Sequence, residues 1–264
     1  MIAKEAEVHL PDLESGIHQV PYYLFPRLSR HPSLVHAIFT RQGGVSRRPY
    51  NSLNIGYGTG DLDEDVQTNI RIMKNALGVG RLRFLRQVHG QHLVVLKGRG
   101  GQGPAEVPRG DALITDRTRL ALMIKQADCQ AVILFDPSNR VVANVHCGWR
   151  GNARNILGAA VGRMKEEFGS EPPRLMAAIG PSLGPCCAEF VSHEEIFPKA
   201  FRRFMVRKNH FDLWAVSRWQ LMEAGLTEQN IELARICTKC RTDLFFSYRA
   251  EGITGRFATL VMLT

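Results

Sequence analysis

Long hydrophobic runs are absent from this chain of 264 residues. No stretch approaches the roughly 20 consecutive apolar residues that a membrane-spanning helix needs, so we expect no transmembrane segment and no membrane partner. Residues 1–16 mix acidic and basic side chains and lack the basic segment and apolar core of a secretory signal peptide. Without an export signal, the expected compartment is the cytoplasm.

Internal repeats and low-complexity segments are absent as well. Residues 97–109, which are rich in glycine and contain two prolines, predict a long loop. Nothing else resembles a linker, and an apolar content of 44% is enough to bury a large core. We therefore expect one compact domain.

Acidic residues are the minority among the charged ones, with 25 Asp and Glu against 34 Lys and Arg and a net charge of +9. Arginine far outnumbers lysine, which favours planar recognition of phosphate or carboxylate, although a basic soluble surface explains the charge equally well. No basic run is interleaved with aromatic residues, and no nucleic-acid-binding motif is present. We expect no nucleic-acid partner.

Cysteines are few, and a disulfide framework is not expected in a cytosolic chain of this size. The six cysteines are better explained as buried apolar residues or metal ligands. The pair Cys237 and Cys240 alone is a weak sign of a structural zinc site, because such a site needs four ligands with paired spacing. Adjacent Cys186 and Cys187 fit no standard tetrahedral half-site. A non-enzymatic binding protein with zinc at Cys237 and Cys240 is therefore the weakest hypothesis.

Apolar periodicity predicts few helices and many strands. Helices are expected at 63–77, at 152–168, at 214–224 and, as two short pieces separated by Pro198, from a capping box at Ser192 and Glu195. Strands are expected near residues 35–40, 84–88, 93–96, 112–114, 120–124, 131–135, 141–145, 175–179, 231–236, 244–247 and 257–263. Because helices and strands do not alternate regularly, the pattern favours an α+β fold with mixed sheets.

Three short strings carry the chemistry: residues 87–89 ending in His89, residues 127–129 ending in Cys129, and residues 146–151 beginning with His146. Two imidazoles and a thiol are a good ligand set for zinc and leave a fourth position for water or substrate, as in an enzyme. His92 is a competitor for His89. Each residue alone could also be an ordinary hydrogen-bonded histidine or a core cysteine.

Turn-forming residues at 136–140 predict a β-hairpin between the strands at 131–135 and 141–145. If Phe135 pairs with Val141, position 129 lies opposite 147 and position 130 opposite 146. Cys129 and His146 then emerge at the same open end, within reach of one ion. A slip of one residue would change the face of each side chain, and the sequence leaves that open.

Several motifs together make the chain resemble the YfiH family, also called the laccase-domain or polyphenol-oxidase family. The matched blocks, in order, are residues 39–46 (FTRQGGVS), 50–56 (YNSLNIG), 87–90 (QVHG), 127–129 (ADC), 146–151 (HCGWRG), 179–181 (IGP) and 245–247 (FFS). The resemblance covers residues 34–264, which we take as the catalytic domain. Residues 1–33 are expected to be an N-terminal extension packed on it.

The resemblance implies a single α+β domain with sandwiched sheets, also compared with cysteine hydrolases of the CNF1 type. It implies zinc held by His89, Cys129 and His146, which would also be the catalytic residues. The implied reactions are phosphorolysis of adenosine, inosine, guanosine and methylthioadenosine, and deamination of adenosine. The chain departs from the family pattern at Ala131, Cys147 and Tyr248, where proline, a small residue and histidine are common, and none of these removes a ligand.

The implied substrates, a purine nucleoside and phosphate, need a binding surface beside the metal. Arg41, Arg150 and Arg249 lie in or directly beside matched blocks and are candidates to hold phosphate. Asn54 and Gln87, in two further blocks, are also expected to bind substrate. We expect a monomer.

Two other enzymatic hypotheses remain. A copper-dependent polyphenol oxidase (laccase) would need clustered copper sites, but none of the nine histidines are two residues apart and no methionine lies near the motifs. A cysteine hydrolase would use Cys129 as nucleophile and His146 as base. Such a hydrolase should survive chelation, whereas a zinc enzyme should not.

Overall fold

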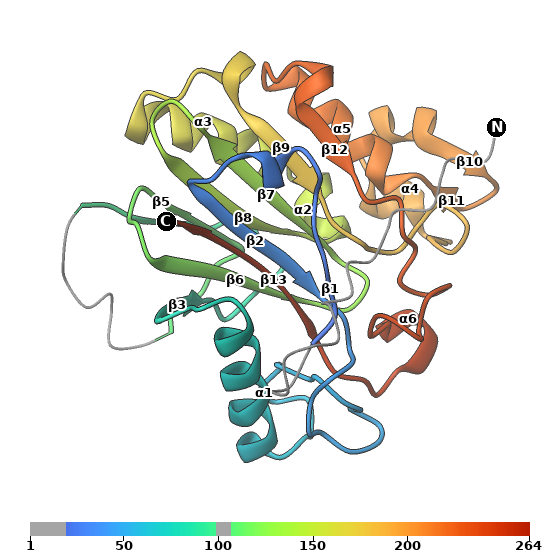
Figure 1. The fold of residues 1–264 in the computed structure, drawn as a ribbon. Coiled ribbons are helices and arrows are strands. Elements are labelled where there is room, and N and C mark those ends of the chain that lie inside the picture. The colour runs from blue at the N-terminus through green and yellow to red at the C-terminus, as the bar shows by residue number, and fades with distance from the viewer. Residues whose placement is uncertain (1–19, 99–106) are drawn as a thin grey trace.

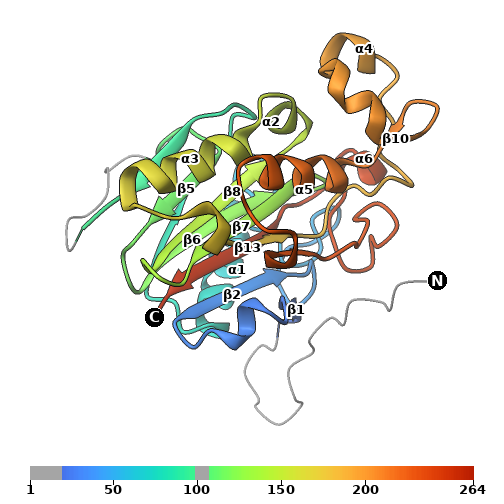
Figure 2. The same cartoon turned by 90° about the horizontal axis from the view of Figure 1, so that it is seen from above.

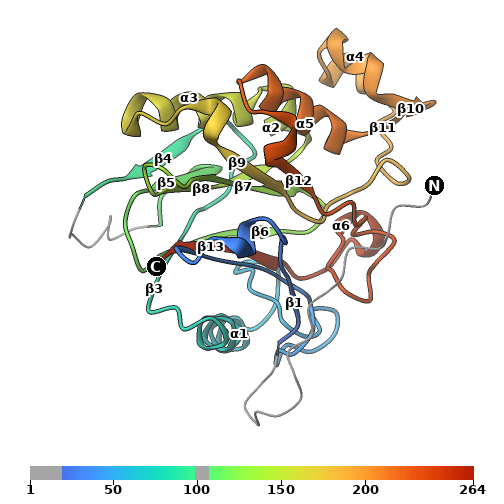
Figure 3. The same ribbon diagram turned by 45° about the horizontal axis from the view of Figure 1, so that its top comes forward.

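The computed structural model describes residues 20–98 and 107–264. Two β-sheets stack face to face, and helices cover the outer face of each sheet (Figure 1, Figure 3). This arrangement confirms the predicted α+β fold with mixed sheets in a sandwich flanked by helices. Most of the loop predicted at 97–109 lies outside the described residues. Within the described ranges, none of the helices is long and apolar enough to span a membrane.

The first sheet has five strands, which are, in spatial order, β1 (Tyr22–Tyr23), β2 (Leu34–Phe39), β13 (Phe257–Leu263), β6 (Leu120–Gln126) and β3 (Arg81–Phe84). The second has six strands, in the order β12 (Ile231–Leu233), β9 (Met176–Ile179), β7 (Gln130–Asp136), β8 (Val141–Cys147), β5 (Ala112–Thr115) and β4 (Leu93–Leu96). Neighbouring strands are antiparallel except for three parallel pairs, β3 with β6, β9 with β12 and β4 with β5. A separate short hairpin joins β10 (Met205–Arg207) and β11 (His210–Phe211).

Helices α2 (Trp149–Ala153), α3 (Ile156–Phe168) and α5 (Leu213–Glu223) cover the outer face of the six-stranded sheet (Figure 2). Helix α1 (Asp63–Ala76) covers the outer face of the five-stranded sheet (Figure 3). The shorter elements are the α-helices α4 (His193–Ile196) and α6 (Tyr248–Glu251) and the 3₁₀-helices η1 (Leu28–Arg30), η2 (Pro172–Arg174), η3 (Lys199–Phe204) and η4 (Glu228–Asn230).

The central strands are apolar on both faces because each sheet is covered on both sides. In β6, Leu122 faces the core between the sheets, whereas Met123 faces α1. In β7, Phe135 faces the same inter-sheet core, whereas Leu134 packs toward α3 and α5. Each fully buried side chain of this size contributes about 1.5–3 kcal/mol. The sandwich is therefore a rigid support for the loops at its strand ends.

The N-terminal segment that the structure describes packs against the first sheet. Strand β1 pairs with β2, and Val20, Phe25 and Leu28 are buried. Strand β1 is thus the edge strand of that sheet, and the division of the chain into an extension up to residue 33 and a catalytic domain stays a prediction.

Several expectations about secondary structure are wrong in detail, and one is the strand expected at 231–236, which ends at Leu233. Residues 244–247 form no strand; Phe245 and Phe246 are buried in the inter-sheet core from a turn, so aromatic character alone misled the prediction. The strand expected at 84–88 ends at Phe84, and beyond it only Arg86 makes an isolated bridge. The helix expected at 152–168 is two helices, because Asn155 adopts a left-handed conformation (φ 55°) and caps α3.

The predicted capping box is also wrong. The side chain of Ser192 makes no cap hydrogen bond, although the two short pieces predicted around Pro198 are present as α4 and η3.

Candidate active site

The three predicted metal ligands converge near the ends of two central strands of the six-stranded sheet, β7 and β8. Cys129 directly precedes β7, His146 lies near the end of β8, and His89 lies in the loop after β3. One ligand atom from each of the three residues lies within 4.8 Å of the others. The rings of His89 and His146 are 4.8 Å apart at 84°. The competing residue His92 is not part of this cluster.

The register of the β7–β8 hairpin differs by one residue from the prediction. Asp136 pairs with Val141, so His146 lies opposite Ala131 rather than position 130. Asp136 stays in the strand because its carboxylate accepts hydrogen bonds from the backbone N–H groups of Ser138 and Asn139 in the turn. Residues two apart on a strand share a face, so this register puts Cys129 and His146 on the same face as diagonal neighbours.

Asp111, directly before β5, organises both histidines although it is not among the predicted residues. Its Oδ1 lies 2.9 Å from Nδ1 of His146, which leaves Nε2 of His146 as the free ligand atom. The same carboxylate accepts the backbone N–H groups of Val88, His89 and Gly90 at 2.7–3.1 Å. A charged residue placed directly before a buried apolar strand was the sequence signal that could have identified it.

Mutual charge stabilisation shifts the pKa values of this cluster. Burial would raise the pKa of the Cys129 thiol, but the charge of His146 and hydrogen bonds from both histidines outweigh burial and lower it to about 6. Burial would lower the pKa of His146, but the Cys129 thiolate and Asp111 raise it to about 9. Burial opposes ionisation of Asp111 too, yet its hydrogen bonds to His146 and Gly90 lower its pKa. Both shifts favour a thiolate on Cys129 and an imidazolium on His146 when no metal is bound.

The backbone around the cluster is tightly constrained. A Cβ atom on Gly148 would lie 2.8 Å from Sγ of Cys129, so only glycine fits there. His89 and Asp128 adopt positive φ angles of 55° and 81°, which cost a non-glycine residue roughly 1–3 kcal/mol. Asp128 is held by three hydrogen bonds to its carboxylate, from the hydroxyls of Thr238 (2.6 Å) and Ser247 (2.7 Å) and from the backbone N–H of Arg249 (2.6 Å).

The cluster opens into a pocket of about 680 Å³. This volume lies in the range of small-molecule sites, about 300–1,000 Å³. The pocket wall contains the basic residues Arg86, Lys125, Arg150, Arg249 and Arg256. It also contains the aromatic residues Tyr57, Trp149, Phe190 and Tyr248. Positive charge and flat apolar surfaces therefore meet beside the three ligand atoms.

Of the predicted substrate residues, Gln87, Arg150 and Arg249 line this pocket. The side-chain amide of Gln87 holds its loop against β6, because it donates to the carbonyl of Lys125 (2.7 Å) and accepts from the backbone N–H of the same residue (2.9 Å). The guanidinium of Arg150 stacks on Trp149. Arg249 donates to the carbonyl of Glu189 at 2.9 Å.

Arg41 and Asn54 are not part of this pocket wall. Arg41 lines a separate surface pocket and is committed to an ion pair with Glu251 at 2.8 Å and to backbone carbonyls. Asn54 is fully buried, and its Oδ1 accepts the backbone N–H groups of Gly56 and Arg256. Both residues hold the loops of the site in place through these contacts, and their role in substrate binding stays a prediction.

Three basic residues of the pocket were not predicted: Arg86, Lys125 and Arg256. Burial lowers the pKa of Lys125, and the charge of Arg256 lowers it further. Burial likewise lowers the pKa of Arg256. Lysine at the end of an otherwise apolar strand, and arginine directly before the last apolar strand, were the available signals.

The chain is similar in sequence to a protein family and to several curated proteins. The family model for the multi-copper polyphenol oxidoreductase laccase matches residues 35–264. A purine nucleoside phosphorylase of Bacteroides thetaiotaomicron is 33% identical over 259 residues, which cover 90% of this chain and 95% of that protein. The purine nucleoside phosphorylase SCO2081 of Streptomyces coelicolor is 35% identical and covers 86% of this chain and 95% of its own length.

Solved structures agree with this result. YlmD from Geobacillus stearothermophilus superposes with a TM-score of 0.83 at 29% identity, over 97% of this chain and 99% of that chain. The Bacillus licheniformis hypothetical protein YfiH gives a TM-score of 0.82 at 27% identity, over 92% and 96% of the two chains.

Proposed function

Because this chain belongs to the laccase-domain (YfiH) family, we propose that it is a zinc-dependent purine nucleoside phosphorylase. Its substrates would be adenosine, inosine, guanosine and methylthioadenosine, and it would also deaminate adenosine. One observation carries the proposal: His89, Cys129 and His146 converge beside a pocket that offers both cationic and aromatic walls. The relatives described above are named purine nucleoside phosphorylases, which agrees with these substrates.

The donor set fits zinc. Two imidazoles and a thiol whose pKa is lowered to about 6 match the nitrogen and sulfur ligands that zinc prefers. Three protein ligands leave one coordination position, as catalytic zinc sites do. When bound, zinc would supply Lewis acidity and lower the pKa of a water molecule. The carboxylate of Asp111 would keep His146 oriented as a ligand.

The remaining pocket residues would bind the two substrates. The guanidinium groups of Arg150 and Arg249 suit paired hydrogen bonds to phosphate oxygens, and Arg86 adds a further positive charge. The rings of Trp149 and Tyr248 offer flat surfaces on which a purine can stack. Held together, phosphate and nucleoside would react without the entropic cost of a second encounter.

A cysteine hydrolase is the second candidate, and one observation favours it. Cys129, His146 and Asp111 follow the order of nucleophile, base and orienting carboxylate. A copper oxidase gains no such support, because the described clusters of metal-ligating side chains contain only His89 and His146 as histidines.

The test is an adenosine assay that resolves adenine from inosine, with and without phosphate, on zinc-loaded and chelator-treated protein. We expect adenine formation that requires phosphate, slower inosine formation that does not, and loss of both on chelation. The matched pair His89→Ala and His92→Ala separates ligand from neighbour, since His92 lies outside the cluster. Activity that survives chelation would contradict the proposal and favour the hydrolase. If both variants keep the activity of the unaltered protein, His89 is not a metal ligand.

A further inference from the structure

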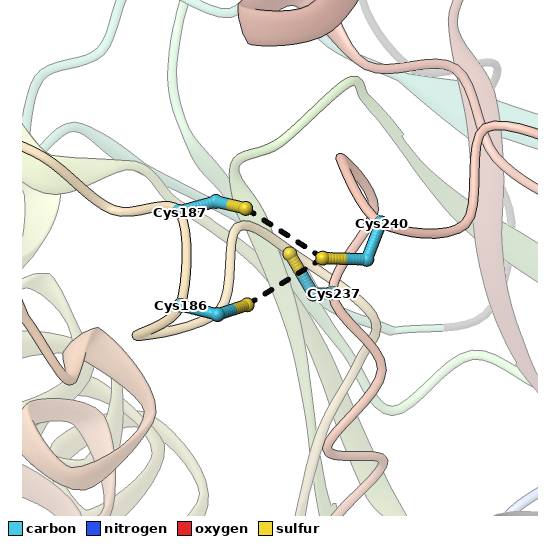
Figure 4. Close-up of side chains that lie close together, drawn as sticks. All are labelled: Cys186, Cys187, Cys237 and Cys240. Carbon is cyan, nitrogen blue, oxygen red and sulfur yellow. Dashed lines mark hydrogen bonds between the residues drawn. The ribbon is translucent and has the colours of Figure 1, made fainter.

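Four cysteines outside the active-site cluster come together in a second cluster of sulfur atoms. Cys186 and Cys187 lie in the loop between β9 and α4, and Cys237 and Cys240 lie in the loop between β12 and α6 (Figure 4). All four Sγ atoms lie within 4.8 Å of one another. We propose that these four cysteines bind a zinc ion in a structural site in which all four ligands come from the protein. This proposal does not depend on the proposed function.

The sulfur distances match a tetrahedral site. The Sγ atom of Cys240 lies 3.6 Å from the Sγ atoms of both Cys186 and Cys187. Four zinc–sulfur bonds of about 2.3 Å imply sulfur–sulfur separations of about 3.8 Å along the edges of the tetrahedron. A disulfide would need about 2.05 Å, and all six cysteines of the chain are free.

The adjacent pair can supply two ligands because the chain turns sharply beneath it. The backbone N–H of Cys187 donates to the carbonyl of Gly184 at 2.9 Å, and both side chains project toward Cys240 (Figure 4). Cys237 receives a hydrogen bond on its sulfur from the backbone N–H of Gly184 at 3.3 Å. Hydrogen bonds from backbone amides stabilise thiolate ligands, so this contact supports the role.

The two loops are fixed against each other before any ion binds. Ser182 forms an isolated parallel bridge with Cys237, with hydrogen bonds of 3.1 Å to Ile236 and 3.0 Å from Thr238. Cys237 is buried, whereas Cys186 and Cys240 are exposed, so an ion can enter from solvent. The guanidinium of Arg207 donates to the carbonyl of Cys186 at 2.8 Å, which places positive charge beside the thiolates.

The two loops that carry these cysteines also contact the pocket wall. Leu183 lines the pocket and donates its backbone N–H to the carbonyl of Asp128, at 2.9 Å. Thr238, inside the Cys237–Cys240 loop, donates its hydroxyl to the Asp128 carboxylate. Four protein ligands leave no open coordination position, so the ion would hold the two loops together and take no part in chemistry.

The first experiment isolates this site with the His146→Ala variant, which removes a ligand of the other cluster. We expect zinc-loaded, dialysed protein to retain one zinc per chain, with X-ray absorption showing only sulfur ligands at about 2.3 Å. Loss of zinc on dialysis, a shell that contains nitrogen or oxygen, or a disulfide found by mass spectrometry without reduction would each overturn the proposal.

The second experiment tests the ligands in the same background. We expect Cys240→Ser to lower zinc content from one per chain to less than a tenth of that, and Cys147→Ala to leave it unchanged, because Cys147 belongs to neither cluster. Full retention by Cys240→Ser would overturn the proposal. The unaltered protein is expected to hold two zinc ions per chain. A total of one ion, together with none retained by His146→Ala, would contradict the second site.

Discussion

The two thiol clusters differ in ligand type, support and access. The first combines imidazole and thiolate ligands from strand ends, and a buried carboxylate, Asp111, orients both histidines. The second consists of sulfur alone, comes from two loops, and is supported by backbone groups such as the N–H of Gly184. Mixed ligands with a vacancy suit catalysis, whereas four thiolates suit a structural role.

The position of the clusters strengthens this difference. Cys129 lies in the pocket wall among arginines, whereas none of the four cysteines lines that pocket. Asp128 connects the two regions, because it precedes Cys129 and accepts the hydroxyl of Thr238. The first cluster would therefore carry out the reaction, and the four-cysteine cluster would only stabilise the structure around it. Each variant below should affect one cluster more than the other.

The largest effect should come from Cys129→Ala or His146→Ala. We expect phosphorolysis to fall by at least about a thousandfold, because a catalytic metal supplies several kcal/mol and each 1.4 kcal/mol is about tenfold in rate. Zinc content should fall by one ion per chain while the four-cysteine cluster keeps its own. Steady-state kinetics and metal analysis check this, and unchanged zinc with lost activity would favour the hydrolase instead.

The pH dependence of zinc binding should also separate the clusters. The pKa of Cys129 is lowered to about 6 and that of His146 is raised to about 9, so between these pH values we expect zinc to displace one proton, from His146, in the first cluster. Its affinity should rise about tenfold per pH unit over that window and level off above it. Partial desolvation and the neighbouring Cys237 and Cys240 raise the pKa values of Cys186 and Cys187, so the second cluster should release at least two protons.

Calorimetry in buffers of different ionisation enthalpy counts these protons. Cys240→Ser isolates the first cluster and His146→Ala the second. A zinc affinity of the first cluster that does not change from pH 6 to 9 would show that the thiolate–imidazolium pair does not form.

Asp111→Asn should have the next largest effect. The amide cannot accept all of the hydrogen bonds from His146, His89 and Gly90, so both histidines lose orientation. We expect zinc affinity of the first cluster to fall by about 10–100-fold, as for other residues that orient metal ligands. Competition with a chromophoric chelator measures it, and the four-cysteine cluster serves as an internal reference. Unaltered affinity would mean that His146 needs no partner.

Arg150→Ala tests the phosphate side of the pocket. We expect the KM for phosphate to rise about tenfold, equivalent to one charge-assisted hydrogen bond, while the KM for the nucleoside changes less. Arg154→Ala is the control, because Arg154 lies one helical turn further on and does not line the pocket. An equal rise in both KM values would assign Arg150 to general packing of the pocket.

Cys240→Ser should change activity least and stability more. We expect loss of the second ion to lower the free energy of unfolding by about 2 kcal/mol. Because each kcal/mol shifts the melting temperature of a chain of this size by roughly 2–4 °C, the melting temperature should fall by about 4–8 °C. Phosphorolysis at 25 °C should stay within about threefold, because Asp128 keeps its own hydrogen bonds. A melting temperature equal to that of the unaltered protein would show that the cluster does not stabilise the fold.

The sequence predicted the first cluster well because its ligands lie in distinctive strings at strand ends. It placed Cys129 and His146 at one end of a hairpin, but the register was wrong by one residue because Asp136 extends the strand and caps the turn. Asp111 was missed because its partners His89 and His146 are 22 and 35 residues away, so its position before an apolar strand singles it out without showing which residues it contacts.

The sequence alone did not predict the second cluster, for a similar reason. Spacing rules for zinc sites describe local half-sites, and adjacent cysteines do not form one. The two cysteine pairs are 53 and 54 residues apart where their sulfurs meet, and the bridge between Ser182 and Cys237 that aligns them is a long-range pairing. The strand expected at 244–247 failed because Phe245 and Phe246 are buried without strand pairing.

The most direct test is a crystal structure of zinc-loaded protein with anomalous data collected at the zinc edge. We expect a peak bound by one nitrogen each from His89 and His146 at about 2.0–2.1 Å and by Sγ of Cys129 at about 2.3 Å, with its fourth position facing the pocket. Absence of a peak at these three atoms, in crystals of protein that is active on adenosine and phosphate, would contradict the proposed zinc centre.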